Sequence, residues 1–199
     1  MKLGTTLRPH GARMAVAVAA VGLLTAGVAT PASGQVPVER SVAAGAENAV
    51  PKGAAPVTAV AGVPLSPSAS DATRAIAAAD PRAVEATANL CGAGYNLQHA
   101  EQLPDSRRLG TIFTYQKNVE PFSSCAIFDN NTGVAKYMKL KLCPNNLSKP
   151  CDVDEGNFSQ YAGPVRVTDG WCAKVNAIMK NTKTSTTALI DRQFLITCN

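Results

Sequence analysis

The sequence predicts an all-β fold, a disulfide-stabilised small β-sandwich or closed barrel of about seven antiparallel strands. All six cysteines fall between positions 91 and 198, and an even number of clustered cysteines is typical of a secreted, disulfide-bonded domain. In the same region, short runs of β-branched and aromatic residues alternate with turn residues. A short helix and a disordered N-terminal segment are expected to precede this domain.

The N-terminus has the three parts of a secretory signal. Basic residues come first, an uncharged apolar run at 14–28 follows, and small residues then lead up to Ala32. We therefore expect a signal peptide at 1–32, with cleavage after Gly34 as the nearby alternative. The apolar run is short for a membrane span, which needs roughly 20 residues. No stable membrane insertion is expected after cleavage.

The charge of the chain is small once the signal is removed. The 199 residues carry a formal net charge of +5, from 19 basic and 14 acidic residues. Cleavage after Ala32 removes three basic residues and no acidic one, which leaves 16 basic against 14 acidic residues and a net charge of +2. So small a charge gives no electrostatic case for nucleic acid as a partner. No cofactor is expected.

Residues 33–79 are predicted to be a disordered linker or pro-segment rich in Ala, Pro and Val. The segment has no helical or strand period and no aromatic residue, so it offers little apolar surface to offset the entropy of ordering. Asp80 and Pro81 then suit a helix start, since Asp caps and Pro fits the first helical position. A short helix to Asn89 would open the folded domain, which we place at 80–199.

The clearest strand is 134–143, where Met138, Leu140 and Leu142 alternate with lysines and should face the core. Asp169-Gly170 and residues 130–133 have the composition of hairpin turns. The expected strands are 95–100, 110–117, 123–129, 134–143, 157–168, 171–180 and 186–198.

The stretch 154–172 is the most distinctive part of the chain. Gly163-Pro164 interrupts its first strand, and because proline donates no ladder hydrogen bond, we expect a bulge or an edge strand there. From Trp171 to Met179 the odd-numbered residues should share one face of the next strand.

The block from Asp154 to Val165 reads D-x-G-x-F-S-x-Y-A-G-P-V and is followed by C-x-K at 172–174. This sequence pattern resembles that of the spore-associated protein A family, which consists of small secreted proteins of Streptomyces and related actinomycetes. The matching residues are Asp154, Gly156, Phe158, Ser159, Tyr161, Ala162, Gly163, Pro164 and Val165, then Cys172 and Lys174.

The resemblance extends over about residues 91–198. Residues 91–95, C-G-A-G-Y, are similar to the C-G-x-G-Y that opens the family's domain, and Cys125 and Cys198 match its second and last cysteines. The family has four cysteines, so Cys143 and Cys151 depart from its pattern. The resemblance implies a secreted, spore-surface protein without a known catalytic role.

The cysteine pairing is open on sequence grounds, because six cysteines allow many connectivities. We expect a local Cys143–Cys151 bridge, since the two come as a close pair. A final hairpin would bring Cys172 and Cys198 to the same end, which leaves Cys91–Cys125 by elimination.

No catalytic, cofactor or metal site is predicted. His99 is the one histidine left after signal removal, and no G-x-S-x-G nucleophile motif or C-x₂-C zinc spacing accompanies it. We interpret His99 as an exposed residue at a strand end. Asp152, Asp154 and Glu155 form an acidic cluster that could bind Ca²⁺ or serve a glycosidase, but a turn-capping role for Asp154 is the favoured reading.

Two groups of side chains leave a binding role open. Lys136, Lys139 and Lys141 make either a solvated strand face or a patch for an anionic polymer such as teichoic acid or nucleic acid. The four tyrosines are expected in the core, and a sugar-stacking surface is their alternative. They are Tyr95, Tyr115, Tyr137 and Tyr161.

The sequence thus favours a secreted non-enzymatic protein that associates with the spore or cell surface. The alternative is a secreted inhibitor or a glycan- or cell-wall-binding module. In that case the loop between Cys143 and Cys151 would present the recognition tip.

Overall fold

The structure is a computed structural model that describes residues 58–196 and 198. All described residues belong to a single compact unit. The expected signal peptide, and the expected linker as far as residue 57, lie outside the described residues. Within the described part, the helices are too short and too polar for any of them to cross a bilayer.

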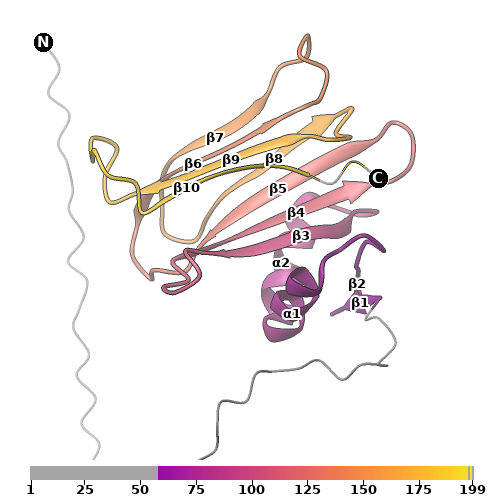
Figure 1. Cartoon of the computed structure of the whole chain (residues 1–199), viewed down its shortest axis with the longest axis horizontal. Coiled ribbons are helices and arrows are strands. Elements are labelled where there is room, and N and C mark those ends of the chain that lie inside the picture. Colours follow the sequence, from indigo (N-terminus) through magenta and orange to yellow (C-terminus); the bar gives the residue numbers. More distant parts are fainter. Residues whose placement is uncertain (1–57, 197, 199) are drawn as a thin grey trace, which may run out of the picture. The chain divides into compact units, whose positions relative to one another are not determined.

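Two four-stranded antiparallel sheets form a sandwich (Figure 1). Sheet I has the order β3-β4-β5-β8, and sheet II has the order β10-β9-β6-β7. The all-β, disulfide-stabilised fold is therefore confirmed, in its sandwich form. Sheet I consists of β3 (Asn96–Leu103), β4 (Gly110–Lys117), β5 (Ser123–Asn130) and β8 (Tyr161–Thr168). Sheet II consists of β6 (Lys136–Cys143), β7 (Asp152–Phe158), β9 (Lys174–Lys180) and β10 (Ile190–Leu195).

The strand missing from the sequence analysis is β7. Residues along β7 alternate between half-buried and exposed. The strand carries acidic residues and a glycine instead of an apolar stripe. Such a strand suits the edge of sheet II, where only β6 pairs with it. Edge strands need little apolar surface, so the sequence pattern that marks a central strand is absent here.

The main core lies between the two sheets. Met138, Leu140 and Leu142 of β6 are fully buried there, as the alternation predicts. Ala173 and the odd-numbered residues 175–179 of β9 are buried in the same core. Trp171 is half-buried and precedes β9, so the predicted face begins at Ala173 and not at the tryptophan.

A second core lies on the other face of sheet I, beneath helices α1 (Asp71–Ala79) and α2 (Pro81–Cys91) (Figure 1). Val84 of α2 packs there with Phe113 and Tyr115 of β4 and with Ile127 of β5. Sheet I is therefore covered on both faces, and seven of the eight residues of β4 are buried.

The prediction that residues 33–79 form a disordered linker is wrong for 58–79. This part contains β1 (Ala59–Val60), β2 (Val63–Pro64) and α1. Ser70 caps α1 by accepting a hydrogen bond from the Thr73 backbone N–H at 3.1 Å. Small aliphatic side chains pack against sheet I and α2, so the segment is ordered by tertiary contacts although it contains no aromatic residue.

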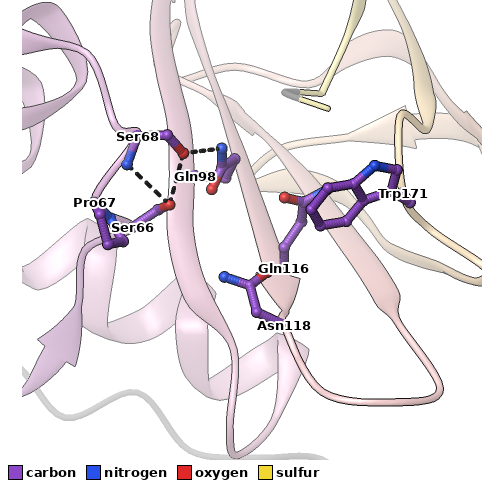
Figure 2. A pocket seen from close by; sticks show the side chains of 7 residues that line it. All are labelled: Ser66, Pro67, Ser68, Gln98, Gln116, Asn118 and Trp171. Atoms are coloured by element: carbon purple, nitrogen blue, oxygen red, sulfur yellow. Dashed lines mark hydrogen bonds between the residues drawn. The ribbon is translucent and has the colours of Figure 1, made fainter. Parts of the chain in front are cut away.

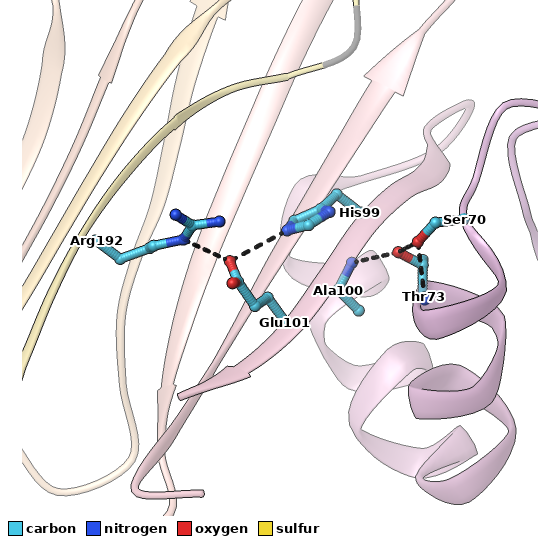
Figure 3. Close-up of polar contacts among 6 residues, drawn as sticks. All are labelled: Ser70, Thr73, His99, Ala100, Glu101 and Arg192. Atoms are coloured by element: carbon cyan, nitrogen blue, oxygen red, sulfur yellow. Dashed lines mark hydrogen bonds and ion pairs between the residues drawn. The ribbon is translucent and has the colours of Figure 1, made fainter. Parts of the chain in front are cut away.

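Helix α1 also protects the edge of sheet I. The Thr73 hydroxyl accepts a hydrogen bond from the Ala100 N–H of β3 at 3.2 Å (Figure 3). Helix α2 begins where the sequence predicts, since the Asp80 side chain accepts from Ala83 N–H at 3.0 Å and Pro81 is in the first turn. It ends two residues later than predicted, at Cys91.

Both predicted hairpin turns are wrong as hairpins. Residues 130–133 lead from β5 in sheet I to β6 in sheet II, and Asp169-Gly170 leads from β8 in sheet I to the β9 region of sheet II. The positive φ after β8 belongs to Asp169 (56°), not to Gly170. Turn chemistry is local and does not specify which strands pair, so the same residues serve a crossover between sheets.

The expectations at Gly163-Pro164 and for the disulfides are confirmed. Strand β8 is the edge of sheet I, and its register with β5 shifts opposite Gly163-Pro164, which is a bulge. The bridges are Cys91–Cys125, Cys143–Cys151 and Cys172–Cys198. The pairing of β9 with β10 also agrees with the predicted final hairpin.

Candidate functional site

A hollow of about 410 Å³ opens where β3 starts, β4 ends and β8 crosses to β9. We call it the Trp171 pocket (Figure 2). In the figure the Trp171 ring faces the glutamines of β3 and β4, and the Ser66–Ser68 segment ahead of α1 closes the other side. The lining residues are Ser66, Pro67, Ser68, Gln98, Gln116, Asn118 and Trp171.

The backbone hydrogen bonds of Gly170 position the adjacent Trp171. The Gly170 carbonyl accepts hydrogen bonds from Ser124 Oγ at 2.7 Å and from Gln116 Nε2 at 3.3 Å. Its N–H donates to Phe122 O at 3.3 Å. The Phe122 ring lies 5.2 Å from the Trp171 ring, in a tilted arrangement. The backbone bonds of Gly170 and the ring contact with Phe122 thus both fix the indole to the start of β5.

The polar residues of the pocket are partly bonded to one another. Gln98 Nε2 donates to Ser68 Oγ at 2.8 Å, and the hydroxyls of Ser66 and Ser68 are 2.9 Å apart. The amide oxygens of Gln98 and Gln116 accept no hydrogen bond from a described group, and neither the Asn118 amide nor the indole N–H bonds to one. These groups give both donors and acceptors to a ligand.

The pocket combines an aromatic face with neutral hydrogen-bonding groups. None of its lining side chains is ionisable. Sugars present flat C–H faces and hydroxyl groups that both donate and accept, and an aromatic ring with fixed amides is complementary to them. The lining residues of the pocket include no ionisable nucleophile or general base, and their chemistry suits an uncharged polar ligand.

The residues of the family-like motif lie away from this pocket and join the two sheets. Asp154 Oδ2 accepts a hydrogen bond from Gly163 N–H at 2.7 Å, and Asp152 Oδ2 accepts one from Arg166 N–H at 2.7 Å. The carboxylates of edge strand β7 thereby close the gap to edge strand β8. Ala162 and Val165 are buried in the main core, whereas Phe158 is half-buried against it.

The other motif positions also have structural surroundings. Tyr161 packs against the second core, and Ser159 is exposed in the turn between β7 and β8. At Gly163, φ is +104° and a Cβ would lie 2.8 Å from Ala126 O, so only glycine fits. Half-buried Pro164 continues the same bulge, and Gly156 lies opposite Met138 of β6. The motif therefore shapes the β7–β8 edge.

Glu155 is not part of a shared carboxylate site. It points to the outer face of sheet II, where it accepts a hydrogen bond from the Tyr137 hydroxyl and pairs with Lys139 Nζ at 2.9 Å. The Tyr137 hydrogen bond, followed by Lys139, lowers the pKa of Glu155 to about 2. The same bond raises the pKa of Tyr137. The acidic cluster of the sequence is thus divided between two faces of β7.

His99 lies within β3, half-buried, and not at an exposed strand end as expected. The Glu101 carboxylate joins two partners, His99 Nε2 at 3.4 Å and Arg192 Nε at 2.9 Å (Figure 3). The His99 ring also packs on Phe194, with centroids 4.7 Å apart. This cluster connects β3 of sheet I to β10 of sheet II, on the side of the sandwich opposite β7 and β8.

The stability of the domain should fall as the pH drops below about 6.5, because burial lowers the pKa of His99 below that ordinary value. The unfolded imidazole then takes up a proton more readily than the folded one. In urea unfolding between pH 7 and 5, wild type should lose stability relative to His99→Gln, which has no group to protonate. A constant difference between the two proteins would contradict this assignment.

The remaining candidates are placed as follows. Tyr95 and Tyr115 are buried in the second core, as expected, whereas Tyr137 lies on the outer face of sheet II beside Glu155, so the expected core role is wrong for it. None of the four tyrosines lines the Trp171 pocket. Lys136 Nζ donates to Asn181 Oδ1 at 2.8 Å, so its ammonium group does not form one patch with Lys139 and Lys141. Sequence reasoning placed Trp171 only on one face of a predicted strand and missed the pocket, because its amides and serines come from segments far apart in the chain.

In comparisons with known proteins, no family model, curated protein or solved structure matches the chain. The resemblance to the spore-associated protein A family stays a prediction.

Proposed function

We propose that the chain is a secreted, non-enzymatic protein that associates with the spore or cell surface by binding an uncharged glycan in the Trp171 pocket. The observation that carries this proposal is an aromatic ring facing fixed amides in a hollow without ionisable side chains. The three disulfides are compatible with an extracellular location. The family resemblance points the same way.

The geometry favours recognition over catalysis for a physical reason. Hydrolysis of a glycosidic bond requires two carboxyl groups across a cleft, and the Trp171 pocket is lined by none. A ring stacked on a sugar and two free amide oxygens instead give orientation and modest affinity. Such a module would retain the protein on a polymer with many repeated sites.

Trp171→Ala should lower retention on glycan at least about tenfold, because it removes the stacking surface. The test is a pull-down on chitin and on cell walls treated with hydrofluoric acid, which retain glycan strands and lose phosphate polymers. Trp171→Phe should keep part of the binding, and Asn118→Ala should lose part of it.

The matched control is Asn157→Ala, which removes an exposed amide on β7, outside the pocket. It should bind as wild type does. If wild type shows no retention on any neutral glycan, or if Trp171→Ala binds equally well, the proposed pocket has another role. Fractionation of cultures into medium, walls and salt-washed spores would then test surface association separately.

A second candidate function is supported by the loop closed by Cys143–Cys151. Leu147 at its tip is 95% exposed, and Asn146 fixes the turn by accepting hydrogen bonds from Ser148 N–H at 3.0 Å and Ser148 Oγ at 2.7 Å. A rigid, bridged loop with one exposed apolar side chain is suited to inhibition of a protease. Leu147→Asp should abolish any such inhibition and leave glycan retention unchanged.

A further inference from the structure

The outer face of sheet II is open and carries several lysines. Both helices pack on sheet I (Figure 1), so no described helix covers this face. Because side chains alternate along a strand and the odd-numbered residues of β9 point inward, Lys174, Asn176 and Lys180 point outward. The same reasoning places Lys139 and Lys141 of β6 on this face.

Two of these lysines are neighbours across the strands. Lys141 is directly opposite Asn176, and Cys143 is directly opposite Lys174. Lys141 and Lys174 are therefore diagonal neighbours, with Cβ atoms about 7 Å apart in an ordinary sheet. Their side chains line one hollow of about 240 Å³ together with Cys143, Asn176 and Gln193. Gln193 of β10 pairs with Asn176, so the two amides form a row beside Lys141.

The charge of this pair is not compensated. Elsewhere in the described part, Lys139 and Lys183 pair with Glu155, and Lys149 pairs with Asp169. Within residues 58–196 and 198, neither Lys141 nor Lys174 forms an ion pair. The side chains of Asn176 and Gln193 likewise make no hydrogen bond there. The hollow thus offers two ammonium groups and two amide N–H₂ groups to one bound group.

This donor set is complementary to a phosphate oxyanion. A phosphodiester carries a single negative charge, so the two ammonium groups more than neutralise it, and the amides can donate to its remaining oxygens. No aromatic side chain lines the hollow, whereas single-stranded nucleic acids are bound largely by base stacking on aromatic rings. A chain of phosphodiester-linked polyols has no bases to stack and fits an open, flat face.

We propose that the outer face of sheet II binds a phosphodiester-linked polyol polymer through Lys141, Lys174, Asn176 and Gln193. This site is separate from the Trp171 pocket and uses a different chemistry. A protein with both sites would hold an uncharged glycan at one end of the sandwich and an anionic polymer on one face. The two attachments would together give retention on a surface that carries both polymers.

The test is binding of the full mature chain to purified, lipid-free poly(glycerol phosphate), measured at low and at physiological salt. Lys141→Gln/Lys174→Gln should lower the affinity roughly tenfold and make the dependence on salt shallower, because fewer phosphate contacts remain. Trp171→Ala should bind this polymer as wild type does, so the outcome is independent of the glycan proposal.

The matched control is Lys149→Gln/Lys183→Gln, which removes the same total charge from two ion-paired lysines. It should lose about twofold or less. If the two double variants lose affinity equally, the loss reflects net charge alone, and the proposed site at Lys141 and Lys174 is wrong. Binding of poly(U) RNA as tightly as poly(glycerol phosphate) would overturn the assigned polymer. If inorganic phosphate competes as well as the polymer does at equal phosphate concentration, the ligand of the site is a free anion, and the proposed polymer is wrong.

Discussion

Gly170→Ala is expected to destabilise the domain by about 3 kcal/mol and to abolish binding at the Trp171 pocket. A Cβ at this position would lie 2.3 Å from Ser124 N and 2.7 Å from Ser124 Oγ. The contact is with the backbone of β5, which cannot retreat without disturbing its pairing with β4. The substitution would also weaken the hydrogen bonds from Ser124 and Gln116 to the Gly170 carbonyl.

Urea unfolding and glycan pull-down measure the two parts of this prediction. Gly156→Ala is the matched control, because Gly156 has no positive φ and an added Cβ there approaches only the end of the Phe158 ring, at 3.1 Å. It should change stability by less than about 1 kcal/mol and leave glycan binding intact. Wild-type stability and retention in Gly170→Ala would show that Trp171 is not positioned through this contact.

Asp129→Asn is expected to stabilise the domain by about 2 kcal/mol at pH 7. Asp129 lies on the helix-covered face of sheet I, and no described group donates a hydrogen bond to its carboxylate. Burial, with a smaller contribution from the nearby Asp80 carboxylate, raises the pKa of Asp129 to about 6. Asn has the same shape and no charge, so it avoids the cost of a buried carboxylate.

The sign of this effect fixes its dependence on pH. The folded carboxyl holds its proton up to about pH 6, whereas the unfolded one loses it near pH 4, so ionisation costs wild-type stability as the pH rises between these values. The advantage of Asp129→Asn should be absent below pH 4 and complete above about pH 7. Asp191→Asn, at an exposed position of β10, is the control and should show a smaller change. A pH-independent or destabilising effect of Asp129→Asn would contradict the assignment.

Local chemistry determined much of the fold. Alternation placed Met138, Leu140 and Leu142 in the core, and Asp80-Pro81 began α2, because strand faces and helix caps depend on nearby residues. The bulge at Gly163-Pro164 follows from the same kind of reasoning, since proline cannot complete a central ladder. The three disulfides agree with the expected pairing, which rests on one close pair, one hairpin and elimination for Cys91–Cys125.

Only the tertiary structure decided how the strands divide between the sheets. Asp169-Gly170 has the composition of a hairpin turn, yet it crosses from sheet I to sheet II, because a turn does not specify which strands pair. Residues 58–79 contain a helix cap at Ser70 but little apolar surface, and contact with sheet I and α2 orders them. The two binding sites follow the same rule. Gln98, Gln116 and Trp171, like Lys141 and Lys174, meet only because strand register and sheet crossings join distant segments.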